Sequence, residues 1–135
     1  MPLVRIDYND TRTSTPGHEI ADAVHNALVA ALGIPERDRF QILTPHHRGE
    51  IIALDAGLGF TRSRGVVIVQ IFTQGGRNTE DKQQLFATLA QHLGAVGVDG
   101  QDLFVSISEN TSADWSFGFG AAQYVTGELA APSRE

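Results

Sequence analysis

The sequence contains no cysteine among its 135 residues, and it has only one tryptophan and two tyrosines. Without cysteine, disulfide bridges, thiolate metal sites and cysteine nucleophiles are excluded. No segment approaches the run of about 20 apolar residues that a membrane-spanning helix needs. The first ten residues lack a basic stretch followed by an apolar one, so no signal peptide is expected. These absences favour a cytoplasmic protein that does not act at a membrane.

Basic residues are also scarce. Ten Lys and Arg residues stand against 16 Asp and Glu residues, which gives a formal net charge of −6. A protein that binds nucleic acid needs clustered basic residues to neutralise phosphates, so nucleic acid is not an expected partner. A small anionic substrate remains compatible with this charge, because one well-placed arginine suffices to bind a carboxylate. The length fits a single domain spanning residues 1–135.

Hydrophobic patterning predicts strands that alternate with helices. Thr15-Pro16 opens the first helix, because it combines a capping hydroxyl with proline at the first helical position, and Gly33 ends it. A second helix begins after Asn78 or Thr79, either of which can cap it, and ends near Gly94. Short apolar or alternating segments predict the strands, and Pro45 is expected to end the second of them. The predicted strands are residues 3–8, 39–44, 66–73 and 103–109.

The two halves of the chain repeat weakly at a constant offset of 64 residues. The matched residues are Gly33-Ile34 with Gly97-Val98, Asp38 with Asp102, Phe40 with Phe104, and Leu3 with Val67. Each half is then a strand–helix–strand unit, and such units cross over right-handedly. Two units predict an α+β plait of the α/β class, with a four-stranded mixed sheet and both helices on one face. Because the other face is left bare, an oligomer is expected.

Several segments carry a resemblance to a known family. They are MPL at the start, GIPERDRFQI at 33–42, DAGLGFTR at 55–62 and ENTSADWSFGFGAAQYVTGEL at 109–129. A twofold β-α-β chain that starts with Met-Pro resembles the tautomerase superfamily, and the closer resemblance is to its malonate semialdehyde decarboxylase members. The resemblance covers nearly the whole chain, and DWSFGFG is its most specific piece. It implies a homotrimer or a hexamer that uses an N-terminal proline.

The resemblance implies that Pro2 is catalytic once Met1 has been removed. The freed secondary amine can act as a base when neutral, polarise a carbonyl when protonated, or form an iminium with an aldehyde. If Met1 persists, Pro2 is an amide and this chemistry is unavailable. Taken alone, a proline at this position is an ordinary start residue.

The family also has a functional aspartate at the position of Asp38, whose role involves a water molecule or the substrate carbonyl. Its arginine pair, two positions apart, is altered here because Gln74 replaces the first arginine. The turn is one residue longer, so Arg77 rather than Gly76 takes the place of the second. A guanidinium beside backbone N–H groups before a helix suits a carboxylate. Without the resemblance, Asp38 is a turn residue and Arg77 a surface arginine.

The resemblance assigns a hydrophobic wall to four residues of the C-terminal segment: Trp115, Phe117, Phe119 and Leu129. Ordinary core packing is the competing interpretation for each of them. An apolar wall would favour loss of CO₂, because a charged carboxylate becomes neutral as it leaves. No metal or organic cofactor is expected, since His46-His47 point apart in an extended chain.

The predicted function is decarboxylation of a small 3-oxo acid, with malonate semialdehyde giving acetaldehyde and CO₂. One alternative is tautomerisation, hydration or dehalogenation of a 2-oxo or unsaturated acid by the same proline. A second alternative is a non-catalytic oligomeric module that keeps the fold, which the loss of one arginine to Gln74 favours.

Overall fold

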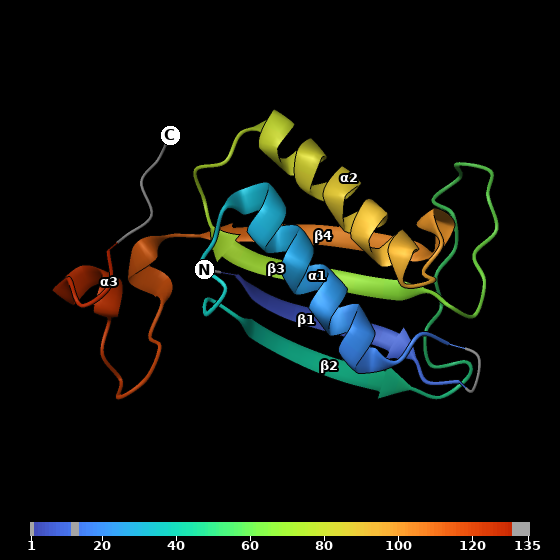
Figure 1. The fold of residues 1–135 in the computed structure, drawn as a ribbon, viewed down its shortest axis with the longest axis horizontal. Coiled ribbons are helices and arrows are strands. Elements are labelled where there is room, and N and C mark those ends of the chain that lie inside the picture. The colour runs from blue at the N-terminus through green and yellow to red at the C-terminus, as the bar shows by residue number, and fades with distance from the viewer. Residues whose placement is uncertain (1, 12–13, 131–135) are drawn as a thin grey trace.

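The computed structural model describes residues 2–11 and 14–130, which form one four-stranded sheet covered by two long helices (Figure 1). The strand order is β2-β1-β3-β4. β1 pairs in parallel with β2 and antiparallel with β3, and β3 pairs in parallel with β4. The strands are β1 (Leu3–Asn9), β2 (Phe40–His46), β3 (Val67–Gln74) and β4 (Leu103–Asn110).

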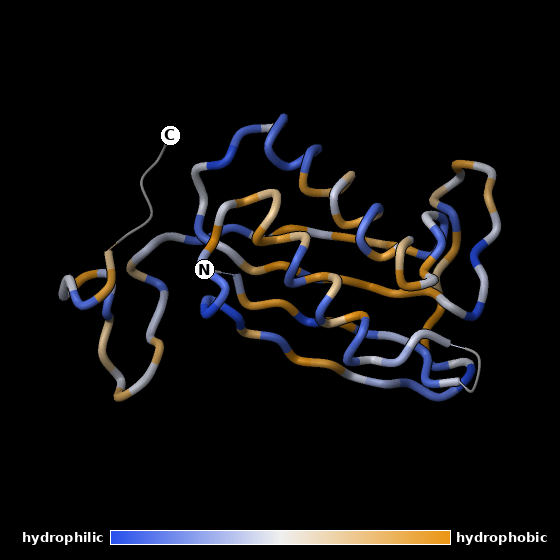
Figure 2. The backbone as a smooth tube through the Cα atoms, viewed as in Figure 1, coloured by the Kyte–Doolittle hydropathy of each residue, from blue (hydrophilic) through white to orange (hydrophobic). Residues whose placement is uncertain are grey.

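Both long helices, α1 (Gly17–Leu32) and α2 (Thr79–Ala95), lie on the same face of the sheet (Figure 1). Alternate strand residues point to this face and are buried, which follows from the two-residue period of a strand. The strand side of the core is Val4, Ile6, Val67, Val69 and Ile71, and the helix side includes Ile20, Val24, Leu28, Leu85, Leu89 and Leu93. Hydrophobic residues therefore run along the central strands in Figure 2.

The predicted fold class and the internal repeat are confirmed by this topology. Gly33 and Gly97 both adopt positive φ, at 66° and 96°, where a side chain would be strained. Asp38 and Asp102 are both buried, and Phe40 and Phe104 are 40% and 46% exposed. Equivalent positions of the two halves therefore share backbone conformation and burial as well as sequence.

Two local predictions were wrong. Pro45 does not end the second strand, which runs to His46. Because β2 is an edge strand, a residue without an N–H group is tolerated there. Thr15 does not cap α1, since its hydroxyl instead donates to the carbonyl of Val96 at 2.8 Å. The hydroxyl therefore ties the start of α1 to the end of α2.

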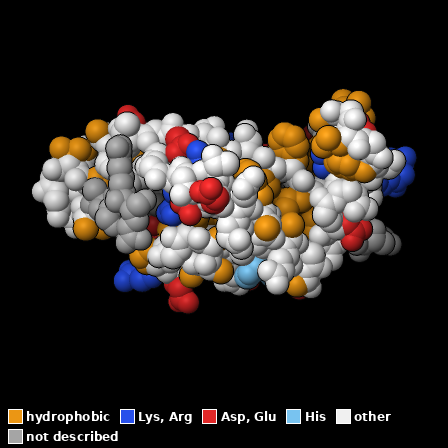
Figure 3. Space-filling model, turned by 90° about the horizontal axis from the view of Figure 1, so that it is seen from above, with side chains coloured by type: hydrophobic (Ala, Val, Ile, Leu, Met, Phe, Trp, Pro, Cys, Tyr) orange, Lys and Arg blue, Asp and Glu red, His pale blue; other side chains and the backbone are white. Residues whose placement is uncertain are grey.

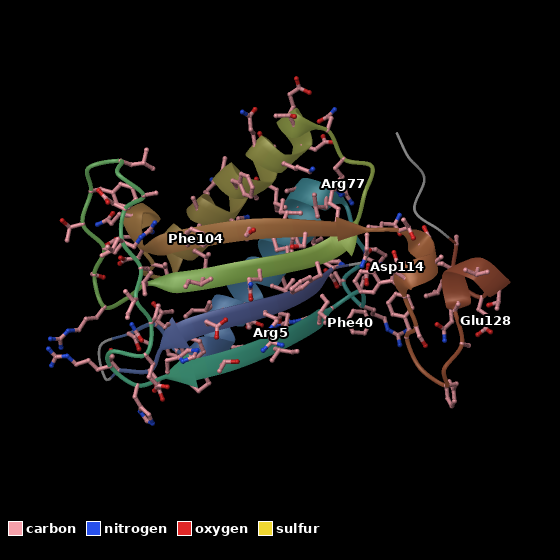
Figure 4. All side chains as sticks on the ribbon, turned by 180° about the vertical axis from the view of Figure 1, so that it is seen from behind. Arg5, Phe40, Arg77, Phe104, Asp114 and Glu128 are labelled. Atoms are coloured by element: carbon pink, nitrogen blue, oxygen red, sulfur yellow. The ribbon has the colours of Figure 1, made fainter. Side chains whose placement is uncertain are left out.

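The opposite face of the sheet carries no helix (Figure 4). Phe40, Ile42 and Phe104 lie on it with 40%, 42% and 46% of their surface exposed. β3 is buried toward the helices, but Ile68 and Phe72 on this face are only partly covered. In the single chain, β3 is therefore buried on one face only.

Two irregular segments extend from the ends of the sheet. The connecting loop (residues 47–66) joins β2 to β3 at one end. The C-terminal arm (residues 111–130) leaves β4 at the other end and contains a short helix, α3 (Gln123–Thr126) (Figure 1). Along residues 2–11 and 14–130, no helix is both long and apolar enough to cross a membrane.

Leu89 provides a test of this core. It is fully buried on α2, so Leu89→Ala removes apolar contacts and leaves a cavity. We expect the free energy of unfolding to fall by about 2–5 kcal/mol. Denaturant titration followed by circular dichroism measures the change. Gln83→Ala, at an exposed position of the same helix, is the matched control and should stay within about 0.5 kcal/mol of the parent.

Candidate active site

Pro2 lies at the start of the central strand β1, and its side chain is fully buried. The next residue, Leu3, pairs with Phe40 on one side and with Phe72 on the other. Asp38 is two residues ahead of Phe40 and is only 6% exposed. The start of the chain is therefore enclosed between two strands, with a buried carboxylate at the same end of the sheet.

The second half of the chain shows how such a carboxylate is used. Asp102, the counterpart of Asp38, accepts the backbone N–H of Ser63 at 2.6 Å and also the Ser63 hydroxyl. A Cβ built on Gly65 would lie 3.4 Å from Asp102 Oδ2. At the offset of 64, Gly65 and the residue after it correspond to Met1 and Pro2. The segment before β3 thus lies against Asp102, and Asp38 is the equivalent buried carboxylate of the first half.

Tyr124 is a site residue that the sequence analysis missed. It is 7% exposed, and its buried hydroxyl forms no hydrogen bond with the described residues. Desolvation, together with the negative charge of Asp38, raises the pKa of Tyr124 to about 12. Tyr124 and Asp38 therefore lie close enough to interact, and Tyr124 stays a neutral hydrogen-bond donor at physiological pH. The only available signal was a tyrosine inside the segment 109–129 that carries the resemblance.

An aromatic cluster links the C-terminal arm to the sheet. The Trp115 and Phe117 rings stack with centroids 5.9 Å apart, and Phe117 meets Tyr124 edge-on at 5.3 Å. Phe117 also contacts Phe40 of β2 at 5.5 Å. The Trp115 indole N–H donates to Asn110 Oδ1 at 2.8 Å, which fixes the ring to the end of β4. Phe117 is thus the centre of an apolar wall beside Asp38 and Tyr124.

The other two predicted wall residues lie elsewhere in the single chain. Phe119 is fully exposed, and Leu129 is 38% exposed. Phe119 sits in a turn with φ of 59°, between Gly118 and Gly120, so its ring is carried outward. The structure therefore brings Trp115 and Phe117 together but leaves Phe119 and Leu129 on the surface of the arm.

Gln123 holds the arm in this shape. Its side-chain oxygen accepts the N–H of Phe117 at 2.9 Å, and its amide nitrogen donates to the carbonyl of Gly118 at 2.9 Å. Its backbone carbonyl accepts the N–H of Leu129 at 3.2 Å. Because Gln123 is only 8% exposed, these bonds are largely shielded from water. One buried side chain thereby positions both the aromatic wall and the helix that carries Tyr124.

The turn between β3 and α2 carries Gln74, Gly76 and Arg77 at the same end of the sheet. Gln74 is the last residue of β3, and its Oε1 accepts the Ser112 hydroxyl at 3.3 Å. Gly76 has φ of 125°, a conformation that L side chains rarely adopt. Figure 4 shows Arg77 on the side of the molecule where the arm begins.

Arg77 is an unusual cation in this region. It is half-buried, yet it makes no side-chain hydrogen bond or ion pair with the part of the chain that the structure describes. The nearby Lys82 is instead paired with Glu109 at the end of β4. A partly desolvated guanidinium with free donors is a ready site for a carboxylate.

Within residues 2–11 and 14–130, no group of three His, Asp or Glu side chains could hold a metal ion.

Comparison with known proteins gives consistent results along the whole chain. The family model described as tautomerase enzyme matches residues 38–118. The probable tautomerase YrdN of Bacillus subtilis (strain 168) is 41% identical over 130 residues, covering 96% of this chain and all of that protein.

Two solved malonate semialdehyde decarboxylases are similar in fold and sequence. One, described as FG41 and inhibited by 3-bromopropiolate, is 58% identical with a TM-score of 0.92, covering 96% of this chain and 99% of that one. The other is 36% identical with a TM-score of 0.88, covering 95% and 99%. A fused 4-OT symmetric trimer, at 24% identity and a TM-score of 0.73 over 93% and 98%, shares the fold.

The role of Gln123 can be tested with the chain's only tryptophan, because Trp115 lies on the arm. Gln123→Leu leaves the N–H of Phe117 and the carbonyl of Gly118 unpaired, which costs about 1–3 kcal/mol. We expect Trp115 fluorescence to shift to the red while helical circular dichroism is retained. Gln83→Leu, at an exposed position on α2, is the control and should leave the emission unchanged.

The raised pKa of Tyr124 gives a second test. Subtracting the absorbance titration of Tyr124→Phe from that of the parent isolates this phenol, and its midpoint should lie near 12 rather than 10. Because the folded pKa is raised, the associated stability is present below pH 10 and is lost as the pH rises toward 12. A midpoint near the ordinary value would contradict the burial of Tyr124 beside Asp38.

Proposed function

The chain belongs to the tautomerase family of enzymes, and we propose that it decarboxylates malonate semialdehyde to acetaldehyde and CO₂ with the amine of Pro2. The observation that carries this proposal is a half-buried Arg77 that has no hydrogen-bond or ion-pair partner among the described residues. It lies at the end of the sheet that encloses Pro2 and Asp38. Similarity to two malonate semialdehyde decarboxylases over nearly the full chain supports the same substrate.

Arg77 would bind the substrate carboxylate, because its donors have no partner among the described residues. Gln74 replaces the family's other arginine and offers an amide, which can donate a hydrogen bond without adding charge. Gly76 has no side chain that would occupy the space between Gln74 and Arg77. The substrate carboxylate is then held by one charge-assisted contact rather than two.

Pro2 would activate the aldehyde at the other end of the substrate. A protonated amine polarises the carbonyl oxygen, and a neutral amine can form an iminium by loss of water. Either arrangement accepts the electron pair when the bond between the carboxylate and its neighbouring carbon breaks. CO₂ leaves and a proton returns to that carbon, which gives acetaldehyde directly when the amine only polarises the carbonyl. On the iminium route, water then hydrolyses the bond to Pro2 and releases acetaldehyde and the free amine.

Asp38 and Tyr124 would control the protons around Pro2. The Asp38 carboxylate can orient the amine or a water molecule, and an opposite charge beside it favours a protonated amine. Tyr124 stays neutral because its pKa is raised to about 12, so it can donate a hydrogen bond to a carbonyl oxygen. Trp115 and Phe117 would exclude water, which disfavours the charged carboxylate relative to neutral CO₂.

This chemistry requires removal of Met1, because only then does Pro2 have a free amine. Intact-mass measurement of the purified protein decides this point. Retention of Met1 would favour the alternative of a non-catalytic module. We further propose a cytoplasmic homotrimer, in which the sheet face that carries Phe40, Ile42 and Phe104 is covered by neighbouring copies.

Tautomerase or hydratase activity is the alternative, since one relative is named a probable tautomerase and the 36% identical structure is described as the basis of decarboxylase and hydratase activities. A tautomerase uses neutral Pro2 as a base, so its rate rises with pH through titration of the amine. A decarboxylase that relies on protonated Pro2 loses activity over the same range.

Substrate preference is tested by assaying the Met1-free protein against malonate semialdehyde and phenylenolpyruvate side by side. We expect a higher kcat/KM for malonate semialdehyde, because the aldehyde suits Pro2 and the single carboxylate suits Arg77. A higher value for phenylenolpyruvate would replace the decarboxylase assignment with that of a tautomerase.

Arg77→Ala should lower kcat/KM for the 3-oxo acid by about 10- to 150-fold, the loss expected of one charge-assisted contact worth about 1.5–3 kcal/mol. Arg39→Ala is the matched control, because Arg39 is held by Asp22 at 2.8 Å and by Gln41 at 2.8 Å. Gln74→Arg should keep or raise activity by restoring the second cation. An Arg77→Ala enzyme within twofold of the parent would place the carboxylate elsewhere.

A further inference from the structure

A cavity of about 370 Å³, the distal cavity, lies at the end of the sheet opposite the candidate active site. It is bounded by the end of β1, the segment that leads into α1, the turn after α2 and the end of the connecting loop. Figure 1 shows these segments converging at the end of the molecule away from the C-terminal arm. Its lining includes Tyr8, Asn9, Thr15, Arg64, Val66 and Gly97. A space of this size accommodates a small molecule.

The internal repeat makes the distal cavity the counterpart of the candidate active site. At the offset of 64, Val66 takes the position of Pro2, and both side chains are buried. Asn9, 9% exposed, takes the position of Thr73, which is 6% exposed and lies just before the turn proposed to hold the substrate carboxylate. Because the nitrogen of Val66 is a backbone amide within the chain, it cannot do the chemistry proposed for Pro2. A ligand of the distal cavity would therefore be bound and not converted.

Asn9 presents an unsatisfied hydrogen-bond acceptor in the distal cavity. Its amide nitrogen donates to the carbonyl of Arg64 at 2.9 Å, which fixes the orientation of the side-chain amide. Its Oδ1 atom is buried and accepts no hydrogen bond from the described residues. Buried polar groups are ordinarily paired, so this oxygen calls for a donor from outside the chain.

Three hydroxyls that line the distal cavity have already used their protons. Ser14 Oγ and Thr15 Oγ1 each donate to a backbone carbonyl at 2.8 Å, and Ser63 Oγ donates to Asp102. Each of these oxygens can therefore offer a ligand only its lone pairs. Together with Asn9 Oδ1, they make a lining that is rich in acceptors and favours a ligand that carries donor groups.

Arg64 supplies the positive charge of the distal cavity. Its side chain is exposed and forms no hydrogen bond or ion pair with the described residues. The described residues that line the cavity include no Asp or Glu, so the local charge is positive although the whole chain is acidic. Figure 3 shows Lys and Arg side chains at the right-hand end of the molecule, where the connecting loop lies. A guanidinium at this place suits a carboxylate.

We propose that the distal cavity is a non-catalytic binding site for a small hydroxycarboxylic acid. The carboxylate pairs with the Arg64 guanidinium, and the hydroxyl donates to Asn9 Oδ1. One ligand thereby meets both features of the lining, a single cation and a set of acceptors without donors. The inference goes beyond the proposed decarboxylation and does not depend on it, because no residue of the candidate active site takes part.

Titration of the full chain with 3-hydroxypropionate, followed by the amide NMR spectrum, tests the proposal. We expect saturable shifts of the backbone amides of Gly65, Val67 and Gly97, which line the distal cavity. Propionate has the same carboxylate but no hydroxyl, so it should bind there about tenfold more weakly. Shifts confined to the amides around Arg77, or equal affinity for the two acids at the distal cavity, would overturn the proposal.

Two variants address the distal cavity by different means. Arg64→Ala should weaken distal binding about tenfold or more, because a charge-assisted contact is lost. Thr11→Phe places a larger side chain in the lining and should block binding, while the hydrogen bonds of Thr11 to Ser14 use only its backbone groups. Arg48→Ala, at an exposed arginine of the connecting loop outside the lining, is the matched control and should bind like the parent. Parent affinity in a folded Arg64→Ala variant would reject the assignment of the carboxylate.

Arg77→Ala separates the distal cavity from the candidate active site. We expect the variant to lose the shifts around position 77 and to keep those of Gly65 and Gly97. Loss of both sets of shifts would show that there is one site and not two, and would reject the inference. Distal shifts in a protein without decarboxylase activity would keep the inference and reject the proposed function.

Discussion

The position of β1 in the middle of the sheet is the constraint on which the rest of the structure depends. Because β1 pairs with β2 on one side and β3 on the other, the first residues of the chain are enclosed rather than frayed. Chain termini are ordinarily poorly ordered, so burying Pro2 needs pairing on both sides of the strand that follows it. The amine that we propose to be catalytic would be held in place by this arrangement.

The internal repeat places equivalent buried carboxylates at the two ends of the sheet. One end carries the proposed chemistry, and the other end fixes the connecting loop. In the second half, Asp102 bonds to Ser63 and fixes the connecting loop to β4. In the first half, the equivalent Asp38 is buried and its charge acts on Tyr124. The same carboxylate position therefore stabilises a loop at one end of the sheet and serves the proposed chemistry at the other.

Periodicity and repeat spacing predicted the strand–helix–strand units well, because buried faces impose regular apolar patterns. Chemistry-bearing residues were predicted mainly through the resemblance. Thr15 and Tyr124 show where local reasoning fails: the partner of the Thr15 hydroxyl is Val96, 81 positions away, and Tyr124 matters through Asp38, 86 positions away (124 − 38 = 86). Neither contact leaves a signal within a few residues of sequence.

The sequence by itself determined the fold class, the twofold repeat, and the candidate residues Pro2, Asp38 and Arg77. The fold class and the repeat follow from local propensity and apolar spacing, which depend on residues that are close in sequence. The candidate residues follow from the resemblance. None of these predictions needs knowledge of distant contacts. Only the tertiary structure decided that Phe117 joins the wall while Phe119 faces outward. It also decided that Lys82 is paired with Glu109, whereas Arg77 has no ion-pair partner among residues 2–11 and 14–130. Exposure and ion pairing depend on which distant segments meet, and that is settled by packing rather than by spacing along the chain.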